Sequence, residues 1–104
     1  RMRLVGSEMC IRDRYKAAQN CGLSLLAHLN VAINGDFKKF KRVIRIAGYV
    51  NSSNNFEDHP KVVNGVSDLM VSVFGENGKH MRIALGATLP LGVAVEVEGL
   101  FELS

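Results

Sequence analysis

The sequence predicts one α+β domain in which two amphipathic helices cover one face of a small β-sheet. The stretches 15–33 and 58–74 repeat apolar side chains every three or four residues, as amphipathic helices do. The stretches 81–86 and 93–102 alternate apolar and other residues, which is typical of strands with one face on a core. The stretch 43–50 is dense in β-branched residues and is expected to be a buried strand. The expected order is therefore helix, strand, helix, strand, strand.

Length and composition bound the class of protein. The chain has 104 residues, of which 47% are hydrophobic and 22% charged, as in an ordinary globular domain. No apolar run is long enough to span a bilayer and no signal peptide is recognisable, so a cytoplasmic protein without membrane contact is expected. Two cysteines without metal-type spacing and three scattered histidines argue against a metal site (Cys10, Cys21, His28, His59 and His80).

Residues 1–14 differ in character from the rest of the chain. They carry four arginines against Glu8 and Asp13, a balance of 4 − 2 = +2, which leaves only +1 of the total +3 for residues 15–104. Nucleic-acid binding through a basic face is therefore not expected. The segment has no clear period and its string VGSEMCIRDR resembles translated sequencing-adapter sequence. We therefore predict a non-native tail over 1–14 and a truncated domain over 15–104; a natural basic tail is the alternative.

Turn signals separate the expected elements. The first helix, with Ala18, Cys21 and Leu29 on its apolar stripe, ends at the stop signal 34–36, Asn-Gly-Asp. A polar loop follows the buried strand, and Pro60 suits the first turn of the second helix. Three strands under two helices leave an uncovered sheet edge, which predicts missing N-terminal strands, an oligomer, or both.

The last two strands carry the candidate chemistry. Arg82 lies among small residues, where its planar guanidinium has room to bind a carboxylate through two hydrogen bonds. Glu96 and Glu98 share one face of the next strand, and Glu96 there can orient water or transfer a proton. The pattern alone allows a second interpretation, in which Arg82 is a surface residue paired with Glu96 or Glu98. Glu98 is expected to be solvated.

Several motifs carry a resemblance to a known family. They are the run 82–86 (Arg-Ile-Ala-Leu-Gly), Leu89-Pro90 and the run 95–99 (Val-Glu-Val-Glu-Gly), with the strand 43–51 and the helix opening 60–65. Together they make residues 15–104 similar to the reactive intermediate deaminase family (Rid, YjgF type). The chain looks closest to the longer bacterial branch called endoribonuclease L-PSP-like.

The resemblance implies a chorismate-mutase-like α+β fold, assembled as a homotrimer with active sites between subunits. It also implies hydrolysis of reactive enamine or imine intermediates, such as 2-aminoacrylate, to a 2-keto acid and ammonia, without a metal or organic cofactor. The family arginine that grips the substrate carboxylate matches Arg82. A helix asparagine beside the site matches Asn64, and the carboxylate that works with water matches Glu96. On pattern alone, Asn64 would be a solvated helix residue.

Three departures from the family keep alternatives open. Ala84 stands where well-studied members have a cysteine, one residue is missing between Arg82 and Pro90, and the family's N-terminal site residues have no counterpart here. The leading interpretation is a deaminase subunit compromised by truncation. The alternatives are a non-catalytic trimer that binds small carboxylates or keto acids and, less favoured, a ribonuclease or translation inhibitor, which would need a basic cleft.

Overall fold

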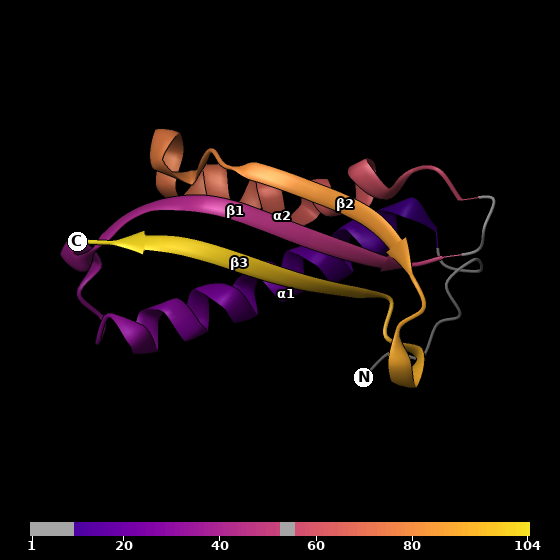
Figure 1. The fold of residues 1–104 in the computed structure, drawn as a ribbon, viewed down its shortest axis with the longest axis horizontal. Helices are drawn as coiled ribbons and strands as arrows, with labels where there is room; N and C mark the ends of the chain where they lie inside the picture. The colour runs from indigo at the N-terminus through magenta and orange to yellow at the C-terminus, as the bar shows by residue number, and fades with distance from the viewer. Residues whose placement is uncertain (1–9, 53–55) are drawn as a thin grey trace.

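The computed structural model describes residues 10–52 and 56–104 of the chain (Figure 1). Its helices are α1, Ile11–Ala32, and α2, His59–Phe74. Its strands are β1, Phe40–Asn51, β2, Met81–Ala87, and β3, Val95–Leu103. Short 3-10 turns precede β1, follow α2 and precede β3 (η2, Phe37–Lys39; η3, Gly75–Gly78; η4, Pro90–Gly92). The predicted order of helices and strands is confirmed.

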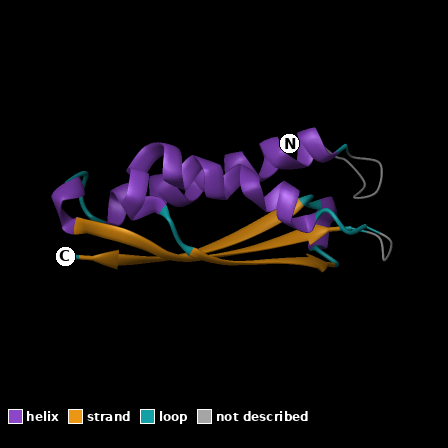
Figure 2. Cartoon of the chain, turned by 90° about the horizontal axis from the view of Figure 1, so that it is seen from above, coloured by secondary structure: helices purple, strands orange, loops and turns teal. Residues whose placement is uncertain are grey.

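The two helices lie side by side on one face of the sheet, which confirms the α+β class (Figure 2). The three-stranded sheet has the order β2-β1-β3. β1 is parallel to β2, with α2 as the crossover, and antiparallel to β3. The last two strands are therefore not neighbours, because β1 lies between them and each forms one edge of the sheet.

The core lies between the helices and the sheet. Burying apolar side chains there stabilises the layers by about 1.5–3 kcal/mol for each large side chain. Its buried members come from both helices and from β1 and β3: Ala18, Val43, Ile46, Val50, Val62, Val63, Val66, Met70 and Val95. Gly48 lets α2 approach β1 closely, because a Cβ there would lie 2.5 Å from Val63 Cγ2.

α1 begins earlier than the sequence pattern indicated. It starts at Ile11 rather than Tyr15, and the Sγ of Cys10 caps it by accepting from the Asp13 amide at 3.4 Å. Arg14 is only 1% exposed and lies over the Phe56 ring, 4.2 Å from the ring centre. The segment 10–14 is thus part of the packed helix. Residues 1–9 lie outside the described residues, and the foreign origin of 1–14 stays a prediction.

The two edge strands place their apolar residues on opposite faces. In β3 the pattern holds, since Val95 and Val97 pack against the core. In β2 it is Ala84 that packs on the core, whereas Met81 is 73% exposed and Leu85 51%. The expectation that the apolar set of residues 81–85 faces the core is therefore wrong for β2. Met81 and Leu85 are thus turned away from the helices, which cover only one face of the sheet (Figure 2).

Candidate functional site

Arg82 points from the edge strand β2 toward α2. Its Nη1 donates to Asn64 Oδ1 at 2.5 Å and to Ser67 Oγ at 3.3 Å. Its Nη2 donates to the carbonyl oxygen of Pro60 at 3.3 Å. Positions 60, 64 and 67 lie on one face of the helix, because residues three and four apart are neighbours on a helix surface. The structure therefore brings together two of the residues singled out in the sequence, Arg82 and Asn64.

No carboxylate neutralises Arg82 within residues 10–52 and 56–104. The ion pairs found there use Asp58, Glu76 and Glu102, and none includes Arg82. Three of the five guanidinium N–H donors are used by neutral oxygens, which leaves Nε–H and one Nη2–H without a partner in the described part of the chain. A half-buried cation with these donors remaining is suited to bind a planar carboxylate.

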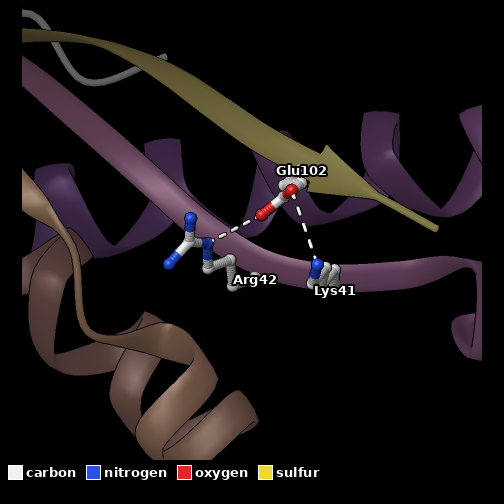
Figure 3. Close-up of polar contacts among 3 residues, drawn as sticks. All are labelled: Lys41, Arg42 and Glu102. Carbon is white, nitrogen blue, oxygen red and sulfur yellow. Dashed lines mark hydrogen bonds and ion pairs between the residues drawn. The ribbon is translucent and has the colours of Figure 1, made fainter.

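Arg42 shows the contrasting case of a neutralised arginine (Figure 3). Its Nε lies 2.7 Å from Glu102 Oε1, and Lys41 Nζ lies 3.7 Å from Glu102 Oε2. Both basic side chains are more than half exposed, so the pairs add little stability. The charge of Arg42 is thus satisfied within the chain, whereas that of Arg82 is not.

A serine and a histidine continue the hydrogen bonds beyond Arg82. Ser67 Oγ lies 2.9 Å from His80 Nε2, and His80 Nδ1 lies 2.5 Å from the carbonyl oxygen of Gly78. Because a carbonyl only accepts, Nδ1 carries the proton, and in the neutral imidazole Nε2 accepts from the Ser67 hydroxyl. Sequence reasoning missed this pair. No local spacing signals it, since the two residues meet only when α2 lies back over β2.

A second histidine lies near the other end of β2. His59 Nε2 is 3.0 Å from Ser52 Oγ, and the imidazole meets the Phe56 ring edge-on with centroids 5.0 Å apart. Gly86 makes room for this contact, because a Cβ there would lie 2.7 Å from His59 Nε2. Polar side chains therefore extend along the whole seam between α2 and β2, with Arg82 near its middle.

Glu96 lies on the opposite edge of the sheet from Arg82. Arg82 on β2 pairs with Ile46 of β1, and Glu96 on β3 pairs with Tyr49 of β1. Two strand spacings, about 10 Å, separate the outer strands. Arg82 therefore does not meet Glu96 or Glu98 within one chain, although consecutive strands carry these residues. The alternative ion pair of Arg82 with either carboxylate is wrong for the same reason.

Glu96 is exposed beside a shallow groove between α1 and β3. The groove has a volume of about 360 Å³ and is lined in part by Cys21, Ser24 and His28. Burial, and then the charge of Glu96, raise the pKa of the Cys21 thiol, whose Sγ donates to the Val95 carbonyl at 3.6 Å. A neutral thiol of this kind is not an activated nucleophile.

Glu98 is exposed, as expected. It also accepts a hydrogen bond from the Tyr49 hydroxyl, and this bond, with the carboxylate charge, raises the pKa of Tyr49. Within the described ranges no three His, Cys, Asp or Glu side chains are grouped to hold a metal ion. The helices of the same ranges are too short or too polar to cross a membrane.

Comparison with known proteins identifies relatives of the whole described fold. The family model described as "YjgF/chorismate_mutase-like, putative endoribonuclease" matches residues 2–102. Protein TCP17 of Trypanosoma cruzi is 42% identical over 102 residues, which are 96% of this chain and 63% of that protein. The chain thus spans just under two thirds of the length of this relative.

Two crystal structures share the fold. That of Atu1372 from Agrobacterium tumefaciens, a protein of unknown function, matches with a TM-score of 0.92 and 37% identity, over 97% of this chain and 65% of the other. That of a "putative endoribonuclease" from Shewanella oneidensis MR-1 matches with a TM-score of 0.88 and 30% identity, over 95% and 66%. Both also extend well beyond the length of this chain.

Proposed function

Because the chain belongs to the YjgF/chorismate mutase-like family, we propose that it is a subunit of a cytoplasmic enamine/imine deaminase. The substrate class is the 2-aminoacrylate type, and the products are a 2-keto acid and ammonia. Arg82 binds the substrate carboxylate, Asn64 holds Arg82, and Glu96 assists the attacking water. The activity belongs to the full-length parent, because this chain spans 63% of its relative TCP17.

One observation carries the proposal: Arg82 is a half-buried cation, and among the described residues its hydrogen-bond partners are neutral oxygens. Asn64 and Ser67 take both hydrogens of Nη1, so the guanidinium is oriented before any ligand arrives. A preoriented anchor lowers the cost of fixing a small substrate. A lysine would offer a point charge without the planar pair of donors, so arginine is the suitable residue for this task.

The reaction needs few protein groups. 2-Aminoacrylate takes a proton from solvent on its methylene carbon to become the iminium ion, and water then adds to the iminium carbon. The C–N bond breaks, ammonia leaves, and the hydroxyl returns a proton to solvent as the carbonyl forms. One water is consumed for each ammonia released, and no electrons are transferred. A carboxylate such as Glu96 takes the proton of the attacking water and returns it to the leaving nitrogen. Most of the reactivity is the substrate's own, so binding and orientation are the protein's main contribution.

The assembly proposed for this chemistry is a homotrimer with sites between subunits. Arg82 and Glu96 lie on opposite edges of one sheet, so a single site can contain both only if two copies contribute. In a closed ring every subunit presents one edge to its neighbour on one side and the other edge on the other side. The sheet face without helices exposes four apolar side chains that such a ring would bury: Met81, Ile83, Leu85 and Leu100.

A coupled assay tests the proposal. The full-length parent is added to a serine or threonine dehydratase reaction, and the rate of keto-acid release is followed. We expect faster release with the wild-type protein and no acceleration with Arg82→Ala. Arg42→Ala is the matched control, since it removes an arginine that is already paired with Glu102 and should leave the acceleration intact. Equal rates with and without the wild-type protein would refute the activity.

A non-catalytic carboxylate binder is the second candidate. Ala84 in the place of the family cysteine and the distance of Glu96 from Arg82 favour it, because both reduce the catalytic groups near the anchor. Calorimetric binding of pyruvate that depends on Arg82, without acceleration in the coupled assay, would select this function. Salt-dependent binding of RNA by the full-length parent would instead support the ribonuclease alternative.

A further inference from the structure

A directed line of hydrogen bonds connects the backbone before β2 to Arg82. It runs from the Gly78 carbonyl to His80 (2.5 Å), from His80 to Ser67 (2.9 Å), and from Ser67 to Arg82 (3.3 Å). Each bond has one direction: Nδ1–H donates to the carbonyl, the Ser67 hydroxyl donates to Nε2, and Arg82 Nη1 donates to Ser67 Oγ. Ser67 therefore uses its one hydrogen on the histidine and keeps its oxygen facing the arginine.

The start of this line is fixed by packing. Gly78 is buried, and a Cβ there would lie 2.1 Å from the Met70 carbonyl oxygen. The η3 turn is thus in backbone contact with the last part of α2, which holds the Gly78 carbonyl in place. Because the carbonyl selects the Nδ1–H tautomer, the fold itself determines that Nε2 is an acceptor.

We propose that Ser67 and His80 are positioning residues for Arg82, an inference that rests on the carboxylate-binding role given to Arg82 above. His80 orients the Ser67 hydroxyl, and Ser67 with Asn64 occupies both hydrogens of Nη1. Rotation of the guanidinium about the Nε–Cζ bond would break these bonds, so the Nε–H and Nη2–H donors keep one orientation. Without Ser67, Asn64 alone would hold Nη1.

A purely structural role explains the pair less well. Ser67 lies inside α2, where serine is a weaker helix former than alanine or leucine. An apolar side chain at this half-buried position would pack against β2 and favour the helix. The hydroxyl adds what an apolar residue lacks, an oxygen that accepts from Arg82 while its hydrogen is committed to His80.

Binding of pyruvate, a product of the proposed reaction, gives the first test. Ser67→Ala and His80→Leu should each raise the pyruvate Kd and the KM of the coupled reaction roughly tenfold, the effect of losing one hydrogen bond in a charged network. The kcat should change much less. His80→Gln, whose amide oxygen can accept from Ser67, should recover most of the affinity. Ser72→Ala, an exposed serine on the same helix, should bind as the wild type does.

Nitrogen NMR of the full-length parent without ligand gives the second test. We expect the Nδ1–H tautomer of His80. We also expect the Arg82 Nη signals to report slow rotation of the guanidinium in the wild type and faster rotation in Ser67→Ala. An Nε2–H tautomer, or equally fast rotation in both proteins, would overturn the inference. So would unchanged pyruvate affinity in Ser67→Ala and His80→Leu when Arg82→Ala abolishes binding. If the wild type binds no pyruvate, the proposed function fails, and the tautomer and rotation rates still decide the positioning role.

Discussion

Replacing Gly65 by alanine should loosen α2 from α1 and thereby disturb the Arg82 site. A Cβ at Gly65 would lie 2.1 Å from the Tyr15 carbonyl oxygen and 3.0 Å from the Gln19 amide nitrogen. Both atoms belong to the backbone of α1, so neither can rotate away. The helices must move apart, and Asn64, which precedes Gly65 on α2, moves with α2.

The magnitude follows from two opposing effects. Overpacking a close contact costs about 1–3 kcal/mol, and a contact with rigid backbone belongs at the upper end of this range. Alanine returns about 1 kcal/mol through its higher helix propensity. The expected net loss is about 2 kcal/mol, which lowers the Tm of a domain of this size by about 8–16 °C.

Gly22→Ala is the matched control at the same helix interface. Its Cβ would lie 2.8 Å from Leu69 Cδ2 and 3.0 Å from Val66 Cγ2, and these side-chain ends can shift. The free energy of unfolding should therefore stay within about 1 kcal/mol of the wild type.

Thermal unfolding by circular dichroism, at one fixed protein concentration, measures both variants. Pyruvate binding below the Tm should weaken in Gly65→Ala and persist in Gly22→Ala. A Tm of Gly65→Ala at or above that of the wild type would refute the backbone contact, and so would equal losses in the two variants.

The remaining predictions concern titrating groups. Burial and the charge of Glu96 raise the pKa of Cys21, so Glu96→Gln should increase the rate of Cys21 alkylation at neutral pH. Mass spectrometry of the Cys21 peptide measures this rate, and an unchanged rate would contradict the prediction. The hydrogen bond to Glu98 raises the pKa of Tyr49. The stabilisation of the fold by this bond is therefore present below about pH 10, the pKa of tyrosine in an unfolded chain, and is lost as the pH rises through the pKa of the folded state. In a Tyr15→Phe background, Glu98→Gln should shift the ultraviolet titration of Tyr49 to lower pH, and an unchanged curve would exclude the bond.

The sequence predicted the helices and strands better than it predicted how they face and pair with one another. The periods of 3.6 and 2 predicted both helices and the last two strands, because burial repeats along each element, and the density of β-branched residues predicted β1. Period alone does not say which face is buried, so the orientation of β2 was predicted wrongly. Local patterns also do not encode which strands pair, and the parallel crossover that places β1 between β2 and β3 is such a long-range feature.

The site was predictable in part for the same reason. Arg82 and Asn64 were found through the family resemblance, and the structure places them in direct contact. Ser67 and His80 were missed, because their contact depends on how α2 lies over β2, and the sequence patterns of the two elements do not indicate it. Glu96 was assigned through the same resemblance, and within one chain the sheet separates it from Arg82.

The inverted strand β2 links the shape of the subunit to the proposed chemistry. A strand that turns Arg82 toward its own helix must turn Ile83 and Leu85 to the other face, because neighbouring side chains alternate. Those apolar side chains would remain in water in a lone subunit, at a cost in free energy that a partner surface would remove. In the proposed trimer, the β3 edge of one copy would also face the β2 edge of the next, so that Glu96 of one copy and Arg82 of the next form one site. One arrangement of copies would thus both bury the exposed apolar face and bring the two halves of the site together.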